Sequence, residues 1–279
     1  MLFKKILNLT LIRILLFLVT FWFLVLFFQS FFSLELIFYN IDYLSALLLA
    51  SYLFELFFNI TFNSFGLKFD NLVLLNLLYV LLITFTSILI IFSMKLIFVD
   101  INSIATPNLP DLMRLIFAQL IVSFVEEIGF RGILLQIIRA KYGVSISMIL
   151  TSLFFALMHI NNPNTTMLSV INIFLAGILF SYMVLKSGSL WPSIIFHFIW
   201  NSLSALVISS PVSGFNYYSI VRFEDANDIL FIILFGGKFG IEGGLIVTSV
   251  LIFSMYFCHK LLILSPYSES MRLKNLYSI

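Results

Sequence analysis

The chain has 279 residues, of which 62% are hydrophobic and only 10% charged, and its formal net charge is +2 at pH 7. An average soluble domain is about 45–50% apolar and about 25% charged. The charged side chains are therefore too few to cover a water-facing surface, which excludes an ordinary soluble protein. The small net charge gives no indication of a nucleic-acid partner. The single cysteine, Cys258, excludes an intramolecular disulfide and a thiolate metal cluster.

Eight apolar segments are candidates for membrane spans. A helix needs about 20 apolar residues to cross the hydrocarbon core, and lipid favours helices because open sheet edges leave backbone groups unpaired. The sequence therefore predicts an all-α membrane bundle of about eight transmembrane helices. The predicted spans are 12–33, 43–62, 71–98, 112–140, 144–161, 166–185, 190–209 and 241–263. The first is interpreted as a span and not as a signal peptide, because no small-residue cleavage site follows it.

Polar or turn-forming segments separate these spans. They fall at 39–42, 63–70, 100–111, 161–164 and 186–189. Residues 210–240 form the longest stretch without a predicted span. Its apolar piece 229–235 is too short to cross a bilayer.

Lysine and arginine in the connecting segments predict the orientation in the membrane. With the N-terminus inside, ten basic residues lie in inside segments and three in outside segments. The inside set is Lys4, Lys5, Arg13, Lys68, Arg139, Lys141, Lys186, Lys260, Arg272 and Lys274, and the outside set is Arg114, Arg222 and Lys238. This predicts a multi-pass protein of the cell membrane with both termini cytoplasmic, which requires an even number of spans.

A first group of ionisable residues lies within the span 112–140. Glu127 and Arg131 are four residues apart, carboxylate first, which favours an ion pair on one helix. Glu126 is five residues from Arg131, about 140° around an α-helix, so Glu126 needs another partner and is the better candidate for a general base. Gly129 and Gly132 are expected to let another helix approach closely. The alternative is a purely structural Glu–Arg pair.

Further polar residues stand in two later spans. His159 lies in one, and His197 and Asn201, four residues apart, share one helix face in the other. Taken singly, each is as well explained by a structural hydrogen bond. Glu126 and His159, however, each lie about 16 residues from a turn near Tyr142, so both sit about 24 Å from it and can meet. The second histidine and the asparagine enter from the same membrane side, so all four are predicted to converge.

Three motifs resemble those of a known family. Glu126-Glu127-x-x-x-Arg131, Phe155-x-x-x-His159 and His197-x-x-x-Asn201 match the E-E-x-x-x-R, F-x-x-x-H and H-x-x-x-N signature of the CPBP family. This family of intramembrane proteases is also called the CAAX prenyl protease 2 or Abi family. The resemblance covers about residues 110–260, and the glycine-rich stretch 236–244, which includes Glu242, is similar to the family's entry to its last helix.

The resemblance implies a division of the chain and a role for each matching residue. Residues 1–110 would hold three N-terminal membrane helices, 111–265 the CPBP-like protease core and 266–279 a cytoplasmic tail. Glu126 with His159 would activate a water, His197 and Asn201 would donate hydrogen bonds to the oxyanion, and Glu127 with Arg131 would order the site. A glutamate and two histidines could also hold Zn²⁺, and a metal-free mechanism is equally compatible.

The leading hypothesis is therefore an intramembrane endopeptidase that acts on a membrane-associated peptide or protein. The alternative is a non-catalytic bacteriocin-immunity or scaffold protein of the membrane. A small transporter with a Glu–His proton relay is a third interpretation, against which stands the lack of an internal repeat.

Overall fold

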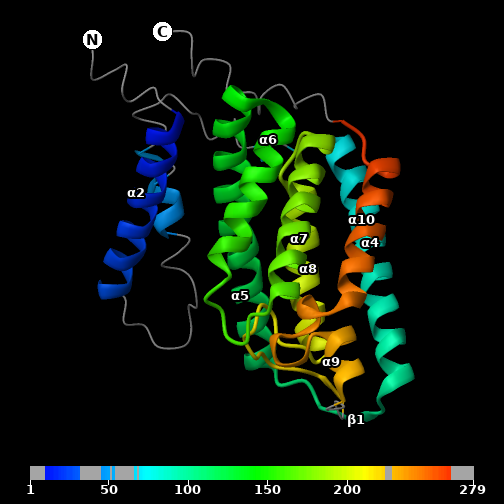
Figure 1. Cartoon of the computed structure of the whole chain (residues 1–279). Helices are drawn as coiled ribbons and strands as arrows, with labels where there is room; N and C mark the ends of the chain where they lie inside the picture. Colours follow the sequence, from blue (N-terminus) through cyan, green and yellow to red (C-terminus); the bar gives the residue numbers. More distant parts are fainter. Residues whose placement is uncertain are drawn as a thin grey trace, which may run out of the picture.

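The computed structural model describes most of the chain as one helical bundle (Figure 1). The described residues are 10–31, 45–50, 52–53, 66–67, 69–223 and 228–264. Their helices are α2 (Thr10–Phe31), α4 (Asn71–Phe98), α5 (Leu109–Glu127), α6 (Leu135–Met158), α7 (Met167–Ser187), α8 (Trp191–Leu206), α9 (Ile229–Phe235) and α10 (Leu245–Leu261). A π-helix, η2 (Ile128–Leu134), joins α5 to α6, and two 3₁₀ turns, η3 (Gly237–Phe239) and η4 (Ile241–Gly243), precede α10.

The helices agree with the prediction of an all-α bundle. Two described helices, α4 and α7, are long and apolar enough to cross a membrane, and α4 is unbroken over its 28 residues. The number of eight spans stays a prediction, and the predicted span 43–62 lies mostly outside the described residues. Helix α10 begins at Leu245, later than predicted, because η3 and η4 take up the glycine-rich stretch before it.

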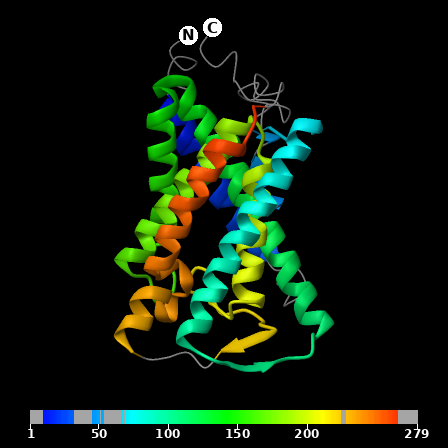
Figure 2. The same cartoon turned by 90° about the vertical axis from the view of Figure 1, so that its right-hand side faces the viewer.

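The predicted turn at Tyr142 and Gly143 is present. Gly143 has φ 80° and ψ 179°, so it breaks α6 into two helical parts. A positive φ of this kind is readily adopted only by glycine. The turn lies at one end of the bundle, and β1 and α9 lie at the other (Figures 1 and 2).

A small sheet departs from the all-α prediction. Strand β1 (Ile101–Ile104) pairs antiparallel with β2 (Val221–Phe223), where a polar loop and an unassigned stretch were expected. Figure 2 shows the pair closing the end of the bundle below α4 and α5. Buried Lys95 of α4 supports it, since Nζ donates to the Ile208 carbonyl at 3.0 Å and lies 4.5 Å from the Phe223 ring centroid. Strands this short have no periodicity that a sequence could reveal.

Two buried apolar clusters flank the centre of the bundle. One joins α2 to α6 and includes Phe17 and Ile137. The other joins α4, α7, α8 and α10 and includes Ile91 and Phe196. Phe130 of η2 packs against both clusters, so the π-helix lies between them.

Helices α6 and α7 approach each other closely at Gly177. A Cβ added at Gly177 would come within 2.8 Å of the Ser152 Cβ and 2.9 Å of its Cα. The expectation of such an approach at Gly129 is wrong, because a Cβ there would meet only the tip of Leu47 at 3.8 Å. Small residues that let backbones approach are typical of helix contacts in membranes.

Gly177→Ala should destabilise the protein, because the new methyl group would overlap Ser152. We expect a loss of about 1–3 kcal/mol, typical of overpacking, seen as a lower Tm in detergent. Gly129→Ala is the matched control and should leave Tm nearly unchanged. Adding Ser152→Gly to the first variant should restore most of the loss, and a Tm that stays low would contradict the steric explanation.

Candidate active site

A buried ion pair stands at the junction of α5 and η2. The Arg131 Nη1 atom lies 2.9 Å from Glu127 Oε1, and neither side chain is exposed. Arg131 also donates through Nη2 to the Gly177 carbonyl at 3.3 Å and lies 4.4 Å from the Phe155 ring centroid. The predicted pairing of Glu127 with Arg131 is therefore present, and Arg131 connects α5, α6 and α7.

The π-helix lies directly after the two glutamates. Its register is shown by the Leu135 N–H, which donates to the Phe130 carbonyl five residues back. π-helical turns inside α-helices are rare and frequent at functional sites. Here the turn carries Arg131 and follows Glu127 without a break, so the acidic pair and its arginine share one continuous helix.

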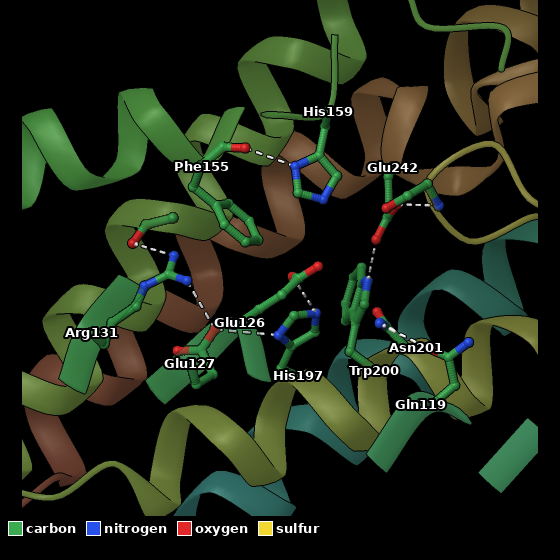
Figure 3. Close-up of polar contacts among 12 residues, drawn as sticks. Gln119, Glu126, Glu127, Arg131, Phe155, His159, His197, Trp200, Asn201 and Glu242 are labelled. Carbon is green, nitrogen blue, oxygen red and sulfur yellow. Dashed lines mark hydrogen bonds and ion pairs between the residues drawn. The ribbon is translucent and has the colours of Figure 1, made fainter. Parts of the chain in front are cut away.

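His197 of α8 contacts both glutamates. Its Nδ1 lies 3.2 Å from Glu127 Oε1, within hydrogen-bond distance, and its Nε2 lies 3.8 Å from Glu126 Oε2. The second distance is too long for a direct hydrogen bond. The ring is stacked on Phe180 with centroids 4.9 Å apart. His197 is therefore held between the two carboxylates (Figure 3).

The two glutamates differ in exposure. The side chain of Glu126 is 26% exposed, whereas that of Glu127 is 0% exposed. The neighbouring positions thus face different surroundings. Glu127 is neutralised by Arg131 in the interior, and Glu126 is left accessible.

His159 stands at the end of α6 with one ring nitrogen fixed. Its Nδ1 lies 2.7 Å from the Phe155 carbonyl oxygen. Because a carbonyl only accepts, Nδ1 must carry the proton of this bond. In the neutral ring, Nε2 is then the basic nitrogen, and Figure 3 shows it directed away from Phe155, toward the centre of the site.

Asn201 is oriented by a residue not among the predicted site residues. Its Nδ2 donates to Gln119 Oε1 at 3.0 Å, and both side chains are buried. Gln119 lies on α5, two helical turns before Glu126. A glutamine within a predicted span is a signal that the sequence contains, but nothing in the sequence indicates its partner on α8.

A cavity of about 460 Å³ brings most of the predicted residues together. Glu126, His159, His197 and Asn201 line it, as does Gln119. Glu127 and Arg131 do not line it and lie behind its wall. His259 does not line it either, and its Nδ1 lies 2.7 Å from the Tyr182 hydroxyl.

A third carboxylate, Glu242, also lines the cavity. Its Oε1 accepts from Trp200 Nε1 at 3.3 Å, and its Oε2 accepts from the backbone N–H and hydroxyl of Ser213 at 2.8 and 3.1 Å. The sequence pattern indicated the glycine-rich stretch around it but assigned the carboxylate no role.

Within the described ranges, no three His, Cys, Asp or Glu side chains are arranged to hold a metal ion. Nδ1 of His159 and Nδ1 of His197 make hydrogen bonds, to Phe155 and to Glu127, which leaves Nε2 of each ring as the nitrogen able to bind a metal. The spatial arrangement of the described side chains, and not the chemistry of these two rings, is what differs from a three-ligand zinc site.

An all-α bundle that encloses carboxylates, imidazoles and an amide among apolar helices defines a membrane protein with an internal polar site. Residues 108–203 match the model of the family described as type II CAAX prenyl endopeptidase Rce1-like. This segment runs from the start of α5 into α8 and contains all three motifs. This match supports the assignment to the CPBP family, the CAAX prenyl protease 2 family that the motifs resemble. Comparison with curated proteins gave no match.

Arg131→Met should strongly destabilise the protein, because it leaves Glu127 buried without its counter-charge. Breaking a buried ion pair on one side typically costs about 3–5 kcal/mol. The double variant Glu127→Gln/Arg131→Met removes both charges and should recover much of that loss. Tm values in detergent for the two single variants and the double variant would measure the coupling.

Arg114→Met is the control for that series. Arg114 pairs with Asp111 at 3.3 Å on the surface, where the two side chains are 53% and 37% exposed. Exposed pairs contribute at most about 1 kcal/mol. Equal losses in the buried and exposed variants would contradict the central role of Arg131.

Proposed function

We propose that this protein is an intramembrane endopeptidase that hydrolyses a peptide bond of a membrane-associated peptide or protein. One observation carries the proposal. Of the two adjacent glutamates, Glu127 is neutralised by Arg131, while Glu126 lines a cavity together with the free Nε2 of His159. A carboxylate and an unprotonated imidazole nitrogen are the groups needed to activate water.

In the proposed reaction, Glu126 and His159 bind a water and take one of its protons. The water oxygen forms a bond to the carbonyl carbon of the substrate, which gives a tetrahedral intermediate. Breakage of the C–N bond follows, and the proton moves to the departing amine nitrogen. The products are a carboxylate and an amine.

Asn201 and His197 are the proposed donors to the oxyanion. Because Nδ1–H of His197 is already bonded to Glu127, His197 donates to the oxyanion only when Nε2 also carries a proton. The Asn201 amide has two N–H groups, and one is used by Gln119, so the second is available to substrate. Donors fixed in advance stabilise the negative charge that develops in the transition state. Gln119 holds the Asn201 amide, and Glu127 holds the His197 ring, so both donors are oriented before substrate binds.

The wall of the cavity away from these residues is apolar. It includes Phe17, Phe21 and Trp22 of α2. An apolar wall beside the reacting groups suits the membrane-embedded part of a substrate.

The proposed mechanism is metal-free, because the described residues form no three-ligand site. If zinc were held by residues such as Glu126 and His159, it would polarise the carbonyl and activate the water. No step above depends on it.

Glu126→Ala and His159→Ala should each abolish cleavage of membrane-tethered peptides. Loss of a general base lowers rates by about 10²–10⁴-fold. The measurement is proteolysis by the full-length protein in liposomes, with a library of membrane-tethered peptides and product detection by mass spectrometry. Asp111→Ala, a change at an exposed carboxylate on the same helix, is the matched control and should retain activity.

The same assay with a chelator tests the metal-free mechanism. We expect full activity after prolonged treatment with EDTA or 1,10-phenanthroline, and activity lost and then restored by Zn²⁺ would contradict it. If the wild type cleaves no library member, the endopeptidase proposal fails. A cellular function that survives Glu126→Gln would then support the non-catalytic immunity or scaffold protein.

We also propose a multi-pass arrangement with both termini in the cytoplasm. The turn at Gly143 and strand β1 then lie on opposite membrane faces. In a Cys258→Ser background, a membrane-impermeant maleimide should label Asn102→Cys in intact cells and Lys141→Cys only after permeabilisation. Both positions are exposed. The reverse pattern of labelling would invert the proposed orientation.

A further inference from the structure

Glu242 lies in the cavity but outside the three motifs. It belongs to η4, on the wall across Trp200 from Glu126 (Figure 3). Its backbone carbonyl accepts from Asn172 Nδ2 at 2.8 Å, and the Gly244 carbonyl accepts from the same nitrogen at 2.9 Å. Both the main chain and the side chain of Glu242 are therefore held in place.

The surrounding backbone is built closely around this position. A Cβ added at Gly240 would lie 2.0 Å from the Pro211 carbonyl oxygen, and one at Gly244 would lie 2.1 Å from that of Leu234. Ser213, which donates twice to Glu242, has φ 50°, a left-handed conformation that is uncommon for a non-glycine residue. Asn162 fixes the other side of this residue by donating to its carbonyl at 3.1 Å.

The charge of Glu242 is not balanced within the part of the chain that the structure describes. All three donors to its carboxylate, from Trp200 and Ser213, are neutral. No lysine or arginine lines the cavity among these residues. Glu127 by contrast has Arg131, and Glu126 has the His197 ring beside it.

An unbalanced carboxylate in such a cavity is costly unless a cation approaches it. A carboxylate offers about four acceptor sites, and three are occupied here, so one position remains for a further donor. Water or a bound molecule can supply that donor, and a cationic group of a bound molecule would also balance the charge, which no described lysine or arginine of the cavity does.

We propose that Glu242 determines substrate specificity by binding a basic side chain, lysine or arginine, close to the scissile bond. The inference rests on the proposed function, because it takes the peptide to lie between Glu126 and Glu242. It identifies the substrate class as cationic membrane-associated peptides. A negatively charged group at the same position, such as a free carboxylate of the chain end, would be repelled.

The test uses a membrane-tethered peptide that the wild type cleaves at a mapped bond. Lysine, leucine or glutamate is placed in turn at each of three positions on either side of that bond. At one of these positions, kcat/KM should follow the order Lys, Leu, Glu, with about tenfold between the extremes, equivalent to about 1.4 kcal/mol. Raising the ionic strength to about 1 M should shrink this difference, because salt screens charge pairs.

Glu242→Gln should lower kcat/KM for the lysine peptide much more than for the leucine peptide, so that the preference for lysine is lost. Ser213→Ala is the matched control. It removes one hydrogen bond to the carboxylate but keeps its charge, so the preference for lysine should remain. A uniform loss across the three peptides in Glu242→Gln would show a structural role only and overturn the inference.

If the Glu242→Gln variant does not fold, the wild-type protein alone still tests the proposed preference for lysine. Cleavage without any charge preference overturns this inference and leaves the proposed function intact. A wild type that cleaves no peptide overturns the proposed function and the inference together. The two failures are therefore distinguishable.

Discussion

The buried contact between Arg131 and Glu127 is the constraint on which the centre of this molecule depends. A guanidinium without exposure must satisfy its donors and its charge inside the protein. Its charge is balanced by a carboxylate one helical turn earlier, and its Nη1 and Nη2 groups donate to that carboxylate and to the carbonyl of Gly177 beside the faces of aromatic rings. Nε has no hydrogen-bond partner among the described residues. The close approach of α7 that Gly177 allows is what brings this carbonyl within reach. The packing of α6 and α7 and the polar centre are therefore one arrangement.

The same contact separates the functions of two adjacent glutamates. Glu127 forms an ion pair with Arg131 and a hydrogen bond with His197. It therefore orients the His197 ring from behind the cavity wall and does not face the cavity itself. Glu126 is turned to the cavity. Neighbouring residues on a helix point about 100° apart, so adjacent carboxylates can serve an interior pair and an open site at once. The pattern explains why the chain has two acidic residues here and not one.

The sequence could predict the parts of this arrangement that depend on spacing along one helix. The Glu127–Arg131 pair follows from a separation of four residues, and the break at Gly143 follows from turn-forming residues between apolar runs. The meeting of His159 with Glu126 in one cavity followed from equal distances to that turn. These inferences need only helical geometry.

Contacts between segments far apart in the chain could not be predicted in this way. The bond from Asn201 to Gln119 and the contacts of Glu242 with Trp200 and Ser213 depend on the tertiary fold. The pairing of β1 with β2 depends on where two loops meet, and the π-helix differs from an α-helix by one residue in its hydrogen bonding. Neither leaves a periodic signal. The catalytic roles of the site residues stay predictions.

The position of the ion pair has a consequence for biogenesis. Single charges at the centre of an inserting helix each cost about 2.5–3.5 kcal/mol. Arg131 and Glu127 lie on one continuous helix, so they can neutralise each other as soon as that helix forms, before the later helices have been synthesised. Glu126 has no such partner until α8 delivers His197. The translocon therefore receives a helix in which the Glu126 carboxylate is unpaired. Glu126 gains its neighbour in the bundle only when His197, which is synthesised much later, packs beside it.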